Sequence, residues 1–183
     1  MKKAALLVVI LLFLGQPVSY ASYAVIDGHT ARIFYASSPH VKMPIASLTK
    51  MWTALVVIEN AELDELVTVS KKATLSEGSS IYLKEGEQVT VNELLHGLMM
   101  RSGNDAAMAL AEHVGGSEQG FVFLMNERAK RAGLRNTTFT NPSGLHHDEH
   151  LSTAYDTAKM LQIAMRNKTF KKIYNAVVDG TID

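Results

Sequence analysis

Four apolar residues near the middle of the first half of the chain repeat at the spacing of an α-helix. Leu48, Met51, Trp52 and Leu55 stand at positions i, i+3, i+4 and i+7. Side chains at these intervals line one side of a helix. The pattern therefore predicts a helix with one buried face, and it places Ser47 in the first turn of that helix.

Further helices are predicted where capping residues and glycines bracket apolar repeats. Thr90 with Glu93, and Thr153 with Asp156, have the spacing of a capping box, in which each side chain bonds the other residue's backbone N–H. Glycines that follow an apolar repeat mark helix ends. The helices so predicted run from Thr90 to Ser102, from about Asn104 to Val114, from Ser117 to Arg131 and from Thr153 to about Arg166.

The β-forming residues gather at the beginning of the chain. Two β-rich runs in residues 22–36 surround Asp27-Gly28, a pair that favours a tight hairpin turn. A two-stranded hairpin alone is marginal in water, so this one needs further partners. Residues 66–90 mix short β-like stretches with Gly78 and Gly86, and they predict an irregular segment.

The first residues have the composition of a secretory signal peptide. Lys2 and Lys3 precede an uncharged apolar run over residues 4–15, and small residues follow at Ser19 and Ala21. The run is shorter than the roughly 20 apolar residues that span a bilayer. We therefore expect an exported protein that is cleaved after Ala21, with retention as an anchor as the alternative, and one domain over residues 22–183.

Charge and cysteine content narrow the possible functions. Without the two leader lysines the chain has 16 basic and 18 acidic residues, which gives no basic surface of the kind that binds nucleic acid. The chain contains no cysteine, which excludes both disulfide stabilisation and thiol catalysis.

Ser47 and Lys50 form the one Ser-x-x-Lys sequence in the chain. Three residues apart on a helix, both side chains lie on one face. A serine hydroxyl becomes a nucleophile when a neighbouring base takes its proton, and a lysine can be that base only when it is neutral. We therefore expect Lys50 to be buried and to have no carboxylate partner. The alternative is that Ser47 caps the helix and Lys50 is solvated.

Ser102-Gly103-Asn104 lies at the predicted break between two helices. Glycine permits a tight turn there, so Ser102 and Asn104 can project from one loop. The alternative is that Asn104 caps the second helix. If these two residues serve the same chemistry as Ser47 and Lys50, all four side chains converge on one cleft.

The two motifs together resemble those of the penicillin-recognising serine enzymes. The resemblance is most specific for the low-molecular-weight D-alanyl-D-alanine carboxypeptidases, and three segments carry it. They are PIASLTKM at 44–51, LMMRSGNDAA at 98–107 and TFTNPSGL at 138–145. It implies an α+β domain of the β-lactamase and penicillin-binding-protein transpeptidase type, of which this chain holds the helical part and the N-terminal hairpin.

The resemblance also implies the chemistry. Ser47 attacks the peptide bond between two D-alanines of a peptidoglycan stem peptide and forms an acyl-enzyme, and Lys50 accepts its proton. Ser102 relays a proton to the leaving D-alanine, while Asn104 orients Lys50 and binds the substrate backbone. β-Lactams acylate Ser47 as substrate mimics. No metal or organic cofactor is implied.

The family's third motif, Lys-Thr-Gly or Lys-Ser-Gly on a sheet strand, has no match in this chain. The nearest string is Lys168-Thr169-Phe170, which we interpret as a solvated helix end. The expectation is therefore an incomplete catalytic domain, truncated before the later strands of its sheet, that a C-terminal segment complements.

Two alternatives and one cluster remain. A β-lactamase shares both motifs, although the glycine of Ser-Gly-Asn favours the carboxypeptidase, and a catalytically dead remnant that binds peptidoglycan or a partner fits the missing third motif. The cluster His146-His147-Asp148-Glu149-His150 could bind a transition metal. Neighbouring loop residues rarely converge on one ion, so we assign it no catalytic role.

Overall fold

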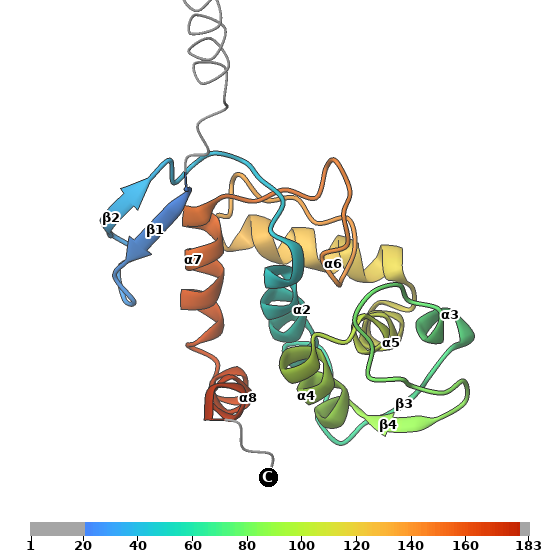
Figure 1. The fold of residues 1–183 in the computed structure, drawn as a ribbon. Coiled ribbons are helices and arrows are strands. Elements are labelled where there is room, and N and C mark those ends of the chain that lie inside the picture. The colour runs from blue at the N-terminus through green and yellow to red at the C-terminus, as the bar shows by residue number, and fades with distance from the viewer. Residues whose placement is uncertain (1–20, 180–183) are drawn as a thin grey trace, which may run out of the picture.

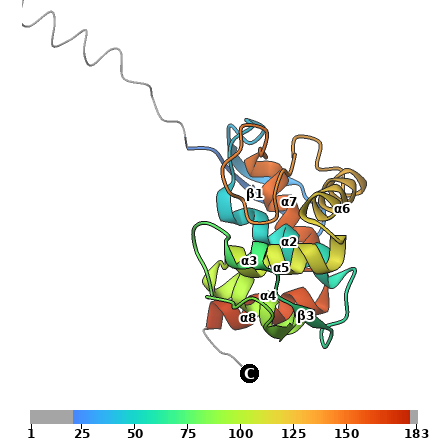
Figure 2. The same ribbon diagram turned by 90° about the vertical axis from the view of Figure 1, so that its right-hand side faces the viewer.

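The computed structural model describes residues 21–179. The predicted signal peptide, residues 1–21, lies outside the described residues except for Ala21. None of the helices within residues 21–179 has the length and apolar character needed to span a bilayer. The described chain is a helical body with two short antiparallel strand pairs, β1–β2 and β3–β4, toward opposite ends of it (Figure 1, Figure 2).

The α+β class predicted from the sequence is confirmed. Helix α2 (Thr49–Ile58) lies at the centre and contacts α4, α5, α6, α7 and α8 (Figure 1). The other helices of the described residues are α3 (Lys71–Thr74), α4 (Val91–Arg101), α5 (Asn104–Gly115), α6 (Glu118–Arg131), α7 (Ala154–Ala164) and α8 (Lys168–Asp179), of which α3 packs on α5.

Local sequence signals account for most of the helix ends. The Thr90–Glu93 capping box is formed in both directions at the start of α4. Thr153 accepts a hydrogen bond from the Asp156 N–H at the start of α7, as a capping residue does. Gly116 closes α5 in the left-handed conformation, with φ +66°.

The N-terminal hairpin is present, but its turn differs from the prediction. Strands β1 (Tyr23–Ile26) and β2 (Ile33–Ser37) pair antiparallel, so residues 27–32 form the connection instead of a two-residue turn at Asp27-Gly28. The Asp27 carboxylate organises this longer turn, because it accepts hydrogen bonds from the N–H groups of His29 and Thr30, at 3.1 and 2.7 Å. β1 packs against α7.

Apolar side chains of the hairpin are left uncovered. Val25 is 49% exposed, Phe34 48% and Tyr35 72%. Within the described residues the hairpin forms a sheet of two strands with no third strand at either edge. An exposed apolar strand edge is where another strand can pair.

The second strand pair joins β3 (Leu66–Thr68) to β4 (Gln88–Thr90), in register from Leu66–Thr90 to Thr68–Gln88. The irregular segment predicted for residues 66–90 runs between these two strands and includes the short helix α3. It lies over α5, which α3 contacts (Figure 2).

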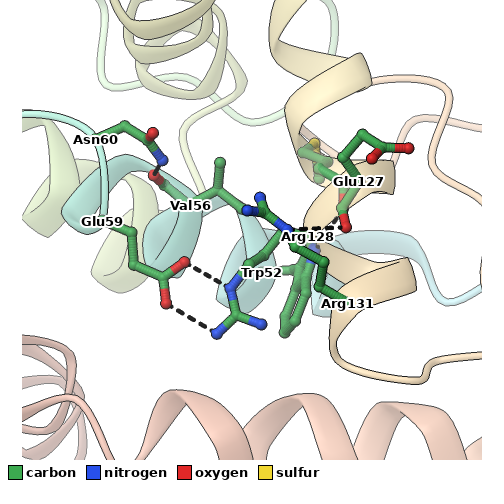
Figure 3. Close-up of polar contacts among 8 residues, drawn as sticks. Trp52, Val56, Glu59, Asn60, Glu127, Arg128 and Arg131 are labelled. Carbon is green, nitrogen blue, oxygen red and sulfur yellow. Dashed lines mark hydrogen bonds and ion pairs between the residues drawn. The ribbon is translucent and has the colours of Figure 1, made fainter.

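Trp52 anchors the buried side of α2. Its ring is fully buried and stacks on Phe139 with centroids 6.3 Å apart, and its Nε1–H donates to the Met125 carbonyl at 3.0 Å. The guanidinium of Arg128 covers the same ring and holds the Glu59 carboxylate with two hydrogen bonds, of 2.7 and 2.9 Å (Figure 3). These contacts fasten α2 to α6 and to the loop that follows it.

The interpretation of Lys168-Thr169-Phe170 as a solvated helix end is wrong. Helix α8 begins at Lys168, and the Asn167 side chain accepts a hydrogen bond from the Phe170 N–H at 3.0 Å. Phe170 is 1% exposed, because α8 packs on α4 and α2. The basic residues of α8 lie on its outer face. They alternate in the sequence with the apolar residues that the helix buries, so the apolar face was not recognised.

Candidate active site

Ser47 lies in a single 3-10 turn, Ala46–Leu48 (η1), immediately before α2. The prediction of a first-turn position is thus correct to within this short lead-in. The Ser47 side chain is exposed, and its hydroxyl has no hydrogen-bond partner among residues 21–179. Ala46 adopts φ +46°, a left-handed conformation that is costly for a residue with a side chain. The Ser47 hydroxyl is therefore accessible on the surface, at the end of a strained turn.

Lys50 is buried, with 4% of its surface exposed, as the chemistry of a lysine base requires. Its Nζ donates to the carbonyl oxygen of Ser143 at 2.8 Å, and no carboxylate of the described residues pairs with it. Burial lowers the pKa of the ammonium from 10.5 to about 8, because the charged form loses its hydration. A sizeable fraction of Lys50 is therefore neutral at weakly alkaline pH.

Ser102 and Gly103 form the break between α4 and α5. Ser102 is left-handed, with φ +57°, and Gly103 is the residue immediately before α5. A Cβ on Gly103 would lie 2.9 Å from Asp105 Oδ1 and 3.1 Å from the Ile81 side chain, so a side chain there would force its neighbours to shift. This tight turn leaves only Ser102 and Gly103 between the end of α4 and the start of α5.

Three of the four predicted residues meet, and the fourth does not. Ser47, Lys50 and Ser102 line one cavity of about 460 Å³. Asn104 lines a second cavity, of about 650 Å³, together with Ser143. The Lys50–Ser143 hydrogen bond lies between the two, so the expectation of a single cleft is corrected to two neighbouring cavities.

Asn104 is buried and is held by contacts other than Lys50. Its Nδ2 donates to the carbonyl of Glu77, and Gly78 approaches so closely that a Cβ there would lie 2.8 Å from this nitrogen. The Asn104 Oδ1 is buried, and no described residue forms a hydrogen bond with it. The implied contact that orients Lys50 is not formed, and the Lys50 Nζ donates to the Ser143 carbonyl instead.

Helix α8 contributes the outer wall of the Ser47 cavity. Tyr174 and Val177 line it beside Leu98 and Met99 of α4. Sequence reasoning missed these residues, since it assigned the stretch at 168–172 to solvent. Their one signal was the apolar spacing within α8, at Phe170, Ile173, Tyr174 and Val177.

Asp105 was also missed. It is 1% exposed, and its carboxylate accepts hydrogen bonds from Ser80 Oγ at 2.6 Å and from the N–H groups of Ile81 and Leu83, each at 3.1 Å. Burial acts to raise the pKa of this carboxyl, but these hydrogen bonds outweigh it and hold the pKa below its usual value. Asp105 thereby fixes the segment at 80–83 against the start of α5.

The loop at 139–150 is fastened to the first turns of α2. Thr53 Oγ1 donates to the Pro142 carbonyl at 2.6 Å, beside the Lys50–Ser143 bond. Gly144 has φ +85°, and a Cβ there would lie 1.9 Å from the Ala46 carbonyl oxygen. Only glycine allows this loop to reach the backbone of the Ser47 turn.

The histidine-rich cluster does not form a metal site within the described residues, where no group of three His, Cys, Asp or Glu side chains comes together. His146 and His147 are exposed, while His150 is 2% exposed and points into the protein. Its buried contacts had no signal in the sequence.

The sequence profile of the D-alanyl-D-alanine carboxypeptidases matches residues 15–178. The chain belongs to the D-alanyl-D-alanine carboxypeptidase family. Among curated members it is 37% identical over 163 residues to the D-alanyl-D-alanine carboxypeptidase DacF of Bacillus subtilis, an alignment that covers 86% of this chain and 42% of DacF. The chain thus spans less than half the length of that relative.

Solved structures of the family agree with the fold. The carboxypeptidase DacD of Francisella tularensis superposes with a TM-score of 0.80 at 34% identity, over 90% of this chain and 44% of DacD. Penicillin binding protein 6B of Escherichia coli superposes with a TM-score of 0.77 at 32% identity, over 87% of this chain and 56% of that protein. The carboxypeptidase family thus accounts for the fold as well as for the motifs.

Proposed function

We propose that this chain carries the nucleophile of a serine-type D-Ala-D-Ala carboxypeptidase, which removes the terminal D-alanine from peptidoglycan stem peptides. The observation that supports this proposal most strongly is the burial of Lys50 in the cavity that Ser47 lines, with no carboxylate partner among residues 21–179. A solvated helix lysine would keep its ordinary pKa and could not serve as a base at neutral pH.

In the proposed reaction, neutral Lys50 takes the proton of the Ser47 hydroxyl as Ser47 Oγ attacks the carbonyl carbon of the penultimate D-alanine. The N–H of Ser47, ahead of α2, donates to the oxyanion that develops. Ser102 passes its hydroxyl proton to the nitrogen of the leaving D-alanine as the C–N bond breaks, and Lys50 returns the proton taken from Ser47 to Ser102. Water then hydrolyses the Ser47 ester. Asn104, whose Oδ1 has no hydrogen-bond partner among residues 21–179, would bind an N–H group of the substrate backbone from the neighbouring cavity.

The proposal includes export and completion by further strands. Residues 1–21 act as a signal peptide, so the enzyme works outside the cytoplasmic membrane, where its substrate is. The exposed Val25, Phe34 and Tyr35 of the hairpin favour a segment C-terminal to the described residues, or a separate chain, that adds strands to it. Such strands would supply the second oxyanion donor and the site for the substrate carboxylate. β-Lactams acylate Ser47 in the same way as substrate.

The test is covalent labelling of residues 22–183 with a fluorescent penicillin, alone and with the C-terminal part of a homologous full-length enzyme. We expect a label on Ser47, stronger with the complementing part, that Ser47→Ala and Lys50→Met abolish. D-Alanine release from a D-Ala-D-Ala peptide is measured in parallel. Absence of label and of D-alanine in both samples would support the catalytically dead remnant, and loss of the penicilloyl group within seconds would support a β-lactamase.

A further inference from the structure

His150 joins two segments that lie far apart in the sequence but meet beneath Ser47. Its Nδ1 accepts a hydrogen bond from the Thr140 N–H at 3.1 Å, and its Nε2 lies 2.8 Å from Thr49 Oγ1. Because Nδ1 accepts, the proton of the neutral ring resides on Nε2. The imidazole therefore donates to Thr49, the residue between the nucleophile turn and Lys50.

The surroundings of His150 keep it neutral and in this orientation. The ring is 2% exposed and meets Phe139 edge-on with centroids 5.7 Å apart. Burial, together with the charge of His147, lowers the pKa of His150 to about 4. The imidazole thus has one tautomer and one set of partners at the pH of a growing cell.

His150 connects the start of α2 to the loop at 140–144. The described contacts of Lys50 Nζ and of the Ser47 turn with this loop all lie between these two segments. The loop gives Lys50 its Ser143 acceptor, receives Thr53 at Pro142, and presses Gly144 against the Ala46 carbonyl. Thr49 also borders Gly144, since a Cβ there would lie 2.9 Å from Thr49 Oγ1. A change at His150 therefore reaches Lys50 through both segments.

We propose that His150 is a positioning residue, which holds the start of α2 by donating Nε2–H to Thr49, while the Thr140 N–H that Nδ1 accepts fixes the tautomer and orientation of the ring. The effect of His150 on catalysis rests on the proposed function. The effect of His150 on the titration of the Lys50 amine is independent of the proposed function, because it exists whether or not the protein catalyses a reaction. Of the two His150 hydrogen bonds, the one to Thr49 positions α2, which carries Lys50 and follows the Ser47 turn.

Two amide substitutions separate the halves of the pair. In His150→Gln the amide nitrogen can take the place of Nε2 and donate to Thr49. In His150→Asn the shorter side chain places its carbonyl oxygen near Nδ1, where it accepts from Thr140 but does not reach Thr49. Both remove the ring and leave a neutral amide, so their general cost to packing is similar. His29→Asn, in the exposed hairpin turn, is the control for a histidine that faces solvent.

The first measurement is an NMR titration of the full chain with ¹³C-labelled lysine, with the Lys50 signal assigned by its loss in Lys50→Met. The second is the rate of penicillin acylation, with the complementing part present, and the third is the unfolding midpoint. We expect His150→Gln and His29→Asn to titrate and acylate like the parent. We expect His150→Asn to shift the Lys50 titration upward and to slow acylation roughly tenfold or more, since small displacements of reacting groups cost at least that much.

Equal titrations and equal acylation rates for the Gln and Asn variants would overturn the proposal, even if both variants were destabilised, because a structural role alone predicts equality. An Asn variant that matches the parent would overturn it as well. If the parent chain takes no label but the Lys50 titrations still differ in the expected order, the proposed function fails while the positioning role of His150 stands.

Discussion

Replacement of Gly144 by alanine tests whether the loop at 139–150 must contact the Ser47 turn. Two costs arise at this position. The backbone has φ +85°, which costs an L-residue about 1–2 kcal/mol, and the new methyl would overlap the Ala46 carbonyl oxygen at 1.9 Å. Overpacking of this kind typically costs about 1–3 kcal/mol, so we expect a total loss of roughly 2–5 kcal/mol. That is a large part of the ~5–15 kcal/mol by which a domain is stable.

Gly86→Ala is the matched control. Gly86 has φ +79°, nearly the same backbone conformation, but no atom lies within 4 Å of a Cβ built there. It therefore pays only the conformational cost, about 1–2 kcal/mol. The difference between the two variants isolates the contact between the loop and the Ser47 turn.

Urea unfolding followed by tryptophan fluorescence measures both variants. Trp52 is the single tryptophan of the chain, is fully buried in α2, and stacks on Phe139 at the start of the loop, so its emission reports on this junction. We expect the midpoint of Gly144→Ala to fall well below that of Gly86→Ala, with penicillin labelling reduced only in the former. Equal midpoints and equal labelling would refute the reasoning that the close approach of Gly144 shapes the site.

Three further predictions follow from buried polar groups. The acylation rate should rise with pH through an apparent pKa of about 8, as Lys50 loses its proton. In the unfolded chain the Lys50 pKa is 10.5, so between pH 8 and 10.5 the unfolded chain binds this proton more tightly and the free energy of unfolding should increase with pH. Lys50→Met should remove this increase when urea unfolding is measured across that pH range. Asp105→Asn should cost about 2 kcal/mol or more and speed hydrogen exchange at the Ile81 and Leu83 amides, which lose a charged acceptor; unchanged exchange would contradict the role of Asp105. Thr53→Val should cost about 1–2 kcal/mol in urea unfolding, because the Pro142 carbonyl loses its donor, and a neutral result would show that water replaces it.

The features that could be predicted from the sequence rest on local chemistry. The start of α4 follows from Thr90 and Glu93, which satisfy backbone N–H groups within a few residues of themselves, and the end of α5 follows from Gly116, which accepts φ +66°. The Ser47–Lys50 spacing and the break at Ser102-Gly103 are also local, and they lie within two of the three segments that indicated the family. Each of these features depends on atoms within about one helical turn.

Contacts between distant segments decided the rest. The lowered pKa of Lys50 depends on burial beneath a loop that brings the Ser143 carbonyl from 93 positions away, and no local pattern encodes that burial. His150 looked like one member of an exposed histidine cluster, yet Thr49, 101 positions away, is its partner. Asn104 lines a neighbouring cavity, and its Nδ2 donates to the Glu77 carbonyl, 27 positions away. Burial and hydrogen-bond partners belong to the packed chain, since desolvation depends on everything that covers a group, and so only the tertiary structure could assign them.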